Sequence, residues 1–347
     1  MLRVSSLFAT VVLLNLVAGC GPSGASTSGG APASTSGEGR PLRIAVIPKG
    51  TTHGFWKSVH AGAIKAEREL QAAGLKISID WKGPPKEDDR DQQIQVVENF
   101  ISAGVSGIAL APLDDETLLG PVRSAGSAGI PVVIFDSSLK GTVGKDFVAY
   151  VATNNRNGGV LAAKRLGQVM GGKGNAILLR YQEGSASTTQ REQGFLETLE
   201  KEFPQIRLIS KDLFAGATME MAQERSQNLL NRFKDEVQGI FTPNESSTFG
   251  MLRALQDAGL AGKVKFVGFD SSVDLMRGMK DKQIDGLVLQ NPIQMGYLAV
   301  KTVVDHLQKK PVPPETDTGA VLVTPENMDE PAMKLLHTPD LSEWLGK

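Results

Sequence analysis

The sequence is poor in the residues that build disulfides, metal sites and nucleic-acid surfaces. It has one cysteine in 347 residues, which excludes a disulfide within the chain and any metal site built from several cysteines. The formal net charge is −1, so nothing indicates the clustered basic surface that a nucleic-acid partner requires. Aromatic residues make up only 5% of the chain. The adjacent rings of Phe55 and Trp56 are therefore unusual, and they closely follow a strand-like apolar run.

The N-terminus has the layout of a secretory signal. A basic residue, Arg3, precedes the apolar run Leu7–Val17, which is too short to span a bilayer as a helix. The run ends in Val-Ala-Gly-Cys at Cys20, which resembles the lipobox of bacterial lipoproteins. We therefore expect a signal peptide over 1–20 and lipidation of Cys20. The alternative is an ordinary signal peptide with a cysteine there by chance.

The next segment has the composition of a tether. Gly21 to Gly39 consists almost wholly of Gly, Ser, Ala, Thr and Pro, and such a segment cannot bury enough apolar surface to order itself. We expect 21–40 to link a membrane anchor to a folded part that works in solvent. The predicted location is the cell envelope, in the periplasm or on the outer face of the cytoplasmic membrane, and the sequence does not decide which membrane holds the anchor.

From Pro41 onward the pattern is that of an α/β protein. Short β-branched runs alternate with helical periodicities, as expected of a parallel sheet covered by helices. In the first helix the apolar positions Val59, Ala63, Ala66 and Leu70 are spaced by three and four residues. The expected strands are Leu42–Ile47, Ile77–Trp81, Gly107–Ala111, Val132–Phe135, Ala176–Leu179, Arg207–Leu213, Ile240–Thr242, Val264–Phe269 and Leu287–Leu289.

A faint internal repeat suggests two similar lobes. The stretch from Val133 to Ser138 reads VIFDSS, and the stretch from Val267 to Ser272 reads VGFDSS. Each is a strand that ends on an aspartate. The alternative is chance similarity between short α/β segments.

The residues that follow the strands are polar. Ligands of open α/β sheets bind at the carboxyl ends of the strands, and here these positions carry carboxylates, amides and hydroxyls. No Ser–His–Asp arrangement, phosphate-binding glycine loop or HExxH spacing is recognisable, so we expect no enzyme, no cofactor and no metal. The charged run from Glu87 to Asp91 is interpreted as a solvated loop and helix start.

This set of side chains suits a small carbohydrate. A sugar hydroxyl both donates and accepts, so it pairs well with the planar groups of Asp, Asn, Gln and Arg. The C–H face of a sugar ring is apolar and packs on an aromatic ring. A buried polar group left unpaired by the wrong sugar costs about 1–3 kcal/mol, which is a source of selectivity.

From Pro41 to Lys347 the sequence resembles the solute-binding proteins of bacterial ABC transporters, of the ribose-binding, type I periplasmic class. The resemblance implies two Rossmann-like lobes, each a parallel sheet flanked by helices, joined by a three-segment hinge with the ligand cleft between them. We expect an N-terminal lobe of 41–153 plus 291–318 and a C-terminal lobe of 154–290 plus 319–347. The motifs that carry it are Gly54-Phe55-Trp56, Ile134–Ser137, Val151–Asn155, Arg191–Phe195, Ile240–Glu245, Val267–Asp270 and Gln290–Pro292.

The resemblance assigns roles position by position. The two rings sandwich the sugar, a carboxylate of the N-terminal lobe and polar groups of the C-terminal lobe hold its hydroxyls, and Thr153 and Gln290 lie at the first and second crossings. The candidate ligand-binding residues are Lys49, His53, Phe55, Trp56, Asp136, Ser137, Thr153, Thr189, Arg191, Asn244, Asp270 and Gln290.

The sequence departs from the family pattern at several of these positions. Ser137 and Thr189 stand where ribose binders have arginines, and His53 stands where an asparagine is usual. Arg191 more often serves the turn that opens its helix. Ribose itself is therefore in doubt. Lys49 could replace the missing cation, and an acidic or otherwise modified sugar is then one hypothesis.

The predicted function is capture of a small carbohydrate, which includes polyols and sugar derivatives, and its delivery as a monomeric component of an ABC importer to a membrane permease. An alternative is a ligand-sensing receptor that signals to a membrane kinase or chemoreceptor. A transcription regulator shares this core, but it would need a DNA-binding helix-turn-helix before residue 41, where the signal and tether lie. The sequence does not identify the ligand.

Overall fold

The structure is a computed structural model that describes residues 41–346, and the predictions for the leader, Cys20 and the tether lie outside these residues. The first of its two six-stranded sheets has the order β11-β5-β4-β3-β1-β2, with parallel neighbours throughout. We call this sheet and its helices the N-terminal lobe. Its strands are β1 (Leu42–Ile47), β2 (Ile77–Trp81), β3 (Gly107–Leu110), β4 (Val132–Phe135), β5 (Ala149–Ala152) and β11 (Glu315–Asp317).

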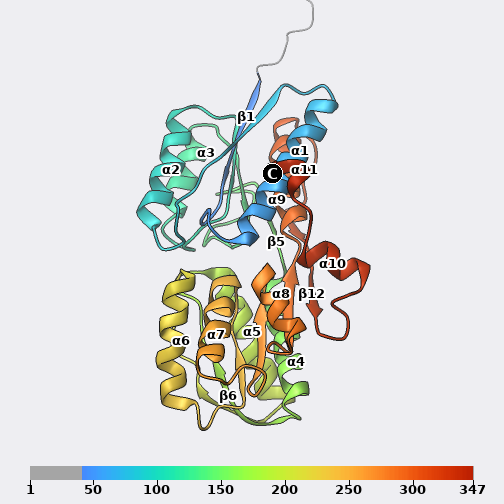
Figure 1. The fold of residues 1–347 in the computed structure, drawn as a ribbon. Coiled ribbons are helices and arrows are strands. Elements are labelled where there is room, and N and C mark those ends of the chain that lie inside the picture. Colours follow the sequence, from blue (N-terminus) through green and yellow to red (C-terminus); the bar gives the residue numbers. More distant parts are fainter. Residues whose placement is uncertain (1–40, 347) are drawn as a thin grey trace, which may run out of the picture. The chain divides into compact units, whose positions relative to one another are not determined.

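Helices cover both faces of this sheet (Figure 1). One face is packed by α1 (Gly54–Ala72) and α9 (Pro292–Leu307). The other is packed by α2 (Arg90–Ser102) and α3 (Leu119–Ser127). Because both faces are buried, β3 and β4 are buried along their whole length, as is typical of parallel strands.

The second sheet has the order β12-β10-β9-β8-β6-β7, and only β12 is antiparallel to its neighbour. We call it and its helices the C-terminal lobe. Helices α4 (Asn155–Val169) and α5 (Ala186–Glu202) pack on one face, and α6 (Met219–Phe233), α7 (Glu245–Asp257) and α8 (Val273–Lys280) on the other. The strands are β6 (Lys173–Leu178), β7 (Gln205–Ser210), β8 (Gly239–Phe241), β9 (Lys265–Phe269), β10 (Gly286–Gln290) and β12 (Ala320–Val323).

The chain passes between the two sheets three times, after β5, after β10 and between β11 and β12. The expected fold class, two similar α/β lobes linked by three segments, is confirmed. The exact residue boundaries of the lobes stay a prediction.

The pattern does not predict helix α4, and its glycines explain why. Gly158, Gly159 and Gly167 are weak helix formers, but α4 packs closely on α5. A Cβ on Gly159 would lie 1.9 Å from the carbonyl oxygen of Arg191, and a Cβ on Gly167 would lie 2.5 Å from the ring of Phe203. The contact between helices therefore demands residues that intrinsic propensity disfavours.

The C-terminal segment contacts both lobes, although the sequence assigns it to the C-terminal lobe alone. Ser271 donates a hydrogen bond to the carbonyl oxygen of His337, at the end of α10 (Pro331–His337). Further on, Arg68 of α1 donates to the carbonyl oxygens of Glu343 and Trp344 in α11 (Ser342–Leu345). Within residues 41–346 no helix is both long and apolar enough to cross a membrane.

Candidate functional site

The carboxyl ends of strands from both sheets meet at one small cavity. It encloses about 30 Å³, far below the 300–1,000 Å³ usual for a ligand pocket, because side chains of the two lobes contact each other across it. We call this the inner cavity. Its lining residues are Lys49, His53, Phe55, Trp56, Glu87, Asp136, Tyr181, Ser187, Thr188, Arg191, Asn244, Glu245, Asp270 and Gln290.

The two rings lie at the start of α1, and both are buried. Phe55 and Trp56 pack edge to face with ring centroids 4.9 Å apart, and Trp56 makes a similar contact with Phe135 at 6.4 Å. The indole Nε1 of Trp56 donates to Oε1 of Glu87 at 2.6 Å. The plane of the indole is therefore held by a charge-assisted hydrogen bond as well as by packing.

The sequence repeat appears as a repeated backbone conformation. Asp136 follows β4 with φ 62°, and Asp270 follows β9 with φ 65°. This left-handed region disfavours most side chains but is tolerated by Asp and Asn. The N–H groups donate to Val151 and Val288 of the neighbouring strands. Each lobe therefore presents one buried aspartate to the cavity in the same way.

Lys49 is fully engaged. Its Nζ lies 3.1 Å from Oδ2 of Asp136 and donates to the hydroxyls of Ser187 at 3.1 Å and Ser185 at 3.5 Å. An ammonium group has three donors, so these partners use all of them. The two serines belong to the C-terminal lobe, and Lys49 therefore contacts both lobes.

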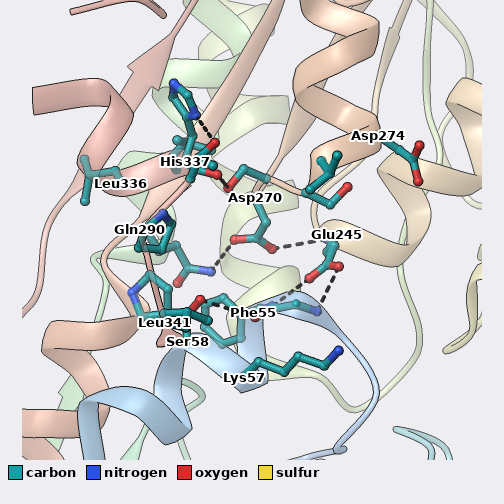
Figure 2. Close-up of a pocket in the computed structure, with 18 residues that line it drawn as sticks. Phe55, Lys57, Ser58, Glu245, Asp270, Asp274, Gln290, Leu336, His337 and Leu341 are labelled. Atoms are coloured by element: carbon teal, nitrogen blue, oxygen red, sulfur yellow. Dashed lines mark hydrogen bonds between the residues drawn. The ribbon is translucent and has the colours of Figure 1, made fainter. Parts of the chain in front are cut away.

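The wall from the C-terminal lobe is built around Asp270. Its carboxylate accepts from Nε2 of Gln290 at 2.8 Å and from the backbone N–H of Glu245 at 3.1 Å, as Figure 2 shows. Burial raises the pKa of Asp270 despite the attraction of Arg191. Oε1 of Gln290 is buried and has no hydrogen-bond partner among the described residues. A ligand hydroxyl is the kind of donor that this oxygen can accept from.

Arg191 and Asn244 both line the cavity, and both also make hydrogen bonds that support the fold. The Arg191 guanidinium donates to Asn155 at 2.8 Å and to the carbonyl oxygen of Pro243 at 2.9 Å, and it lies over the ring of Phe269. Asn244 is the N-cap of α7 and forms a capping box with Ser247. Both side chains are thereby fixed at the edge of the cavity.

The interpretation of the charged run from Glu87 to Asp91 as solvated is wrong for Glu87. Its side chain is 6% exposed and lines the cavity. Its Oε1 lies 2.6 Å from Nδ1 of His53. Burial lowers the pKa of His53, but the adjacent carboxylate outweighs burial and raises that pKa to about 9. Burial likewise opposes ionisation of Glu87, but His53 lowers the Glu87 pKa to about 2. The pair is therefore charged at neutral pH.

Three of the predicted residues do not line the inner cavity. Ser137 lies beside it and accepts from the backbone N–H of Ser187. Thr153 donates to the carbonyl oxygen of Gly319 at the crossings. Thr189 is exposed. Five residues that line the inner cavity are not among those predicted from the sequence. The only signal for them in the sequence is a place shortly after a strand or at the start of a helix. They are Glu87, Tyr181, Ser187, Thr188 and Glu245.

A larger pocket of about 380 Å³ adjoins the inner cavity and shares Phe55, Glu245, Asp270 and Gln290 with it. Figure 2 shows this pocket with Leu336 and Leu341 of the C-terminal segment on its border. The carboxylate of Glu245 accepts from the backbone N–H groups of Gly54 and Phe55 at 3.1 and 2.9 Å. A residue of the C-terminal lobe thus holds the first turn of α1. Among residues 41–346 no cluster of His, Cys, Asp or Glu is suited to a metal ion.

Two similar α/β lobes, three crossings and a polar, ring-lined cavity at opposed strand ends define the class of hinged solute-binding proteins. Residues 44–311 match the family model "Periplasmic binding protein domain". An ABC transporter solute-binding protein from Agrobacterium vitis, solved with bound D-fucose, is 34% identical, with 85% of this chain and 99% of that chain covered and a TM-score of 0.81. A carbohydrate transporter solute-binding protein from Agrobacterium radiobacter, in complex with D-arabinose, is 29% identical over 86% and 99% of the two chains, with a TM-score of 0.80.

Among curated proteins, the D-allose-binding periplasmic protein of Escherichia coli K12 is 29% identical over 266 residues, which is 75% of this chain and 83% of that protein. The chain belongs to the periplasmic binding protein family of ABC transporters. Its members bind solutes outside the cytoplasm and are not enzymes, so the expected family and the expectation of a non-catalytic protein are confirmed.

Proposed function

We propose that this protein captures a small neutral sugar outside the cytoplasm and delivers it to the permease of an ABC importer. One observation carries the proposal. The rings of Phe55 and Trp56 and the hydrogen-bonding pair Asp270 and Gln290 face the same cavity from opposite lobes. Relatives that bind D-fucose, D-arabinose and D-allose support a monosaccharide. The predicted residues that line the inner cavity remain the proposed ligand contacts, and Ser137, Thr153 and Thr189, which do not line it, are not among them.

The charges of the cavity favour a neutral ligand over an acidic one. Lys49 is paired with Asp136, and His53 is paired with Glu87. Arg191 is attracted to Asp270 and Asp136, and Glu245 adds a further buried carboxyl group. Among the described residues that line the cavity, no cation is left over for a ligand carboxylate, whose burial without a partner is costly. The acidic-sugar hypothesis therefore loses its support from Lys49.

We further propose how the protein works in its cell. A sugar that contacts both lobes stabilises the closed form relative to the open one, and the permease recognises that form. Lipidation of Cys20 and a tether over 21–40 would hold the monomeric protein at the membrane while the lobes move freely. Metabolic labelling with palmitate should mark the natural chain and leave a Cys20→Ser variant unlabelled, because Cys20 is the only cysteine.

The first experiment is a thermal-shift screen of the chain that starts at Gly21. Ligands that bind only the folded state raise the melting temperature by mass action. We expect a rise with one or more neutral pentoses, hexoses or polyols and none with sugar acids or amino acids. The rise should vanish in Trp56→Leu and persist in Trp81→Leu, a matched tryptophan on β2 that does not line the cavity. A best ligand among acids or amino acids would overturn the proposal.

A further inference from the structure

The carboxylate of Glu87 gathers three donors from two separate parts of the chain. Oε1 accepts from the indole of Trp56 and lies equally close, at 2.6 Å, to Nδ1 of His53. Oε2 accepts from the hydroxyl of Tyr181 at 2.5 Å. Trp56 and His53 belong to the N-terminal lobe, as Glu87 does, whereas Tyr181 follows β6 of the C-terminal lobe. The carboxylate therefore contacts both a candidate sugar-stacking ring and the opposite lobe.

The surrounding backbone keeps Glu87 in this place. Its carbonyl oxygen accepts from Nε2 of Gln182 at 3.0 Å, a second bond to the C-terminal lobe. Gly50 leaves the room that the side chain needs, because a Cβ there would lie 2.8 Å from Cγ of Glu87. The glycine directly after Lys49 is thus explained by the passage of the Glu87 side chain.

We propose that Glu87 is a positioning residue for sugar recognition, which fixes the Trp56 ring and couples its position to lobe closure through Tyr181. This inference rests on the proposed function. When the lobes separate, the Tyr181 hydroxyl leaves the carboxylate and both groups are hydrated. The Glu87 carboxylate that holds the indole is then fixed by residues of its own lobe only. Closure restores the third bond, so the ring is fully ordered only in the closed form.

The same geometry predicts a pH dependence. His53 faces three carboxyl groups, Glu87 of its own lobe and Glu245 and Asp270 of the opposite lobe, and Lys49 also faces Glu87. His53 stays protonated until the pH rises through its pKa of about 9. Because closure brings Glu245 and Asp270 to His53, sugar affinity should be highest while His53 is protonated and should fall as the pH rises through about 9. Without the Glu87 charge, the fall should begin at a lower pH.

The test measures sugar affinity by calorimetry in Glu87→Gln, Tyr181→Phe and the double variant, with the best neutral sugar of the screen. Glu87→Gln should weaken binding by about 10- to 100-fold, the loss expected for a hydrogen bond to a charged group. Tyr181→Phe should weaken it less, chiefly through faster release. The double variant should bind no more weakly than Glu87→Gln, because both changes remove one network. Asp88→Asn, an exposed neighbour, is the matched control and should bind normally.

A sugar-free readout separates this inference from the proposed function. The His53 imidazole, assigned by its loss in His53→Gln, should titrate near pH 9 in the wild type and markedly lower in Glu87→Gln, as followed by NMR. If the wild type binds no sugar, the proposed function fails. If it binds sugar, yet Glu87→Gln keeps wild-type affinity and an unchanged pH profile, only this inference fails. Should Glu87→Gln not fold, unchanged sugar release in Tyr181→Phe would overturn the coupling.

Discussion

Replacing Asp270 with asparagine should separate stability from binding. Asparagine keeps the shape of the side chain and tolerates the left-handed backbone at φ 65°, whereas alanine there would add a backbone cost of about 1–2 kcal/mol. Asp270→Asn removes the charge, and its hydrogen bonds can be kept if the Gln290 amide turns over, because the unpaired Oε1 of Gln290 can then accept from the asparagine amide while the asparagine oxygen accepts from the N–H of Glu245. The carboxylate oxygens of Asp270 lie on the cavity wall, held by Gln290 and by the N–H of Glu245.

The loss of affinity follows from the charge. A hydrogen bond to a charged group contributes about 1.5–3 kcal/mol, and tenfold in affinity corresponds to about 1.4 kcal/mol. If the ionised Asp270 accepts one sugar hydroxyl, the asparagine variant should bind about 10- to 150-fold more weakly.

The effect on stability has the opposite sign. Burial raises the pKa of Asp270 in the folded protein, so ionisation disfavours the fold. Below the unfolded pKa of about 3.9 the carboxyl is protonated in both states and costs nothing. As the pH rises through the folded pKa, the cost appears in full. Without sugar, Asp270→Asn should therefore melt at a higher temperature than the wild type at pH 7, and the gain should vanish near pH 3.

Calorimetry of sugar binding and thermal melts at pH 3 and pH 7 measure both effects. Asp281→Asn is a suitable control, because this aspartate is exposed at the end of α8 and should change neither affinity nor melting temperature appreciably. An Asp270→Asn variant that binds sugar within threefold of the wild type, or that is less stable at pH 7, would refute the reasoning.

Three further predictions concern packing, fluorescence and pH. Gly159→Ala should destabilise the fold by about 1–3 kcal/mol or more in urea unfolding, because its Cβ would lie 1.9 Å from a carbonyl oxygen of α5. The control Gly126→Ala has open space around its Cβ. It should be neutral or stabilise the fold by up to about 1 kcal/mol. The chain has 3 tryptophans, and a variant that keeps only Trp56 should still report sugar binding by a change in fluorescence. Because the folded pKa of His53 is raised to about 9, the stability from its pair with Glu87 should be lost as the pH rises through 9, and a His53→Gln variant should lose that part of the pH dependence.

The sequence predicts the parts of the site that depend on local pattern. Asp136 and Asp270 each end a short apolar strand, and the carboxyl ends of parallel strands meet at one edge, so their convergence follows from the α/β pattern. Phe55 and Trp56 are equally visible, as adjacent rings in a chain with few. Most of the predicted residues line the inner cavity for this reason.

The rest depends on contacts between segments far apart in the chain. Glu87 lies in a run of charges that locally resembles a solvated loop, and only its contacts with His53, Trp56 and Tyr181 bury it. Thr189 is the opposite case, a residue predicted to bind the ligand that the structure leaves exposed. Helix α5 turns Ser187 and Thr188 toward the cavity instead. A single helical residue changes the facing side by about 100°, and the sequence does not fix that rotation.

The direct bonds between the lobes contribute to the affinity in addition to the sugar contacts. Lys49 to Ser187, Glu87 to Tyr181, and Glu245 to the first turn of α1 all join the lobes without a ligand. The apparent dissociation constant is the intrinsic one divided by the fraction of molecules in the binding-competent form. Each of these bonds raises the closed fraction, provided that the same groups are hydrated when the lobes part. Gln182 joins the carbonyl oxygen of Glu87 across the lobes and does not line the cavity, so Gln182→Ala should weaken binding of every sugar by the same factor. Substitutions at Asp270 or Gln290 should instead change the ranking of sugars.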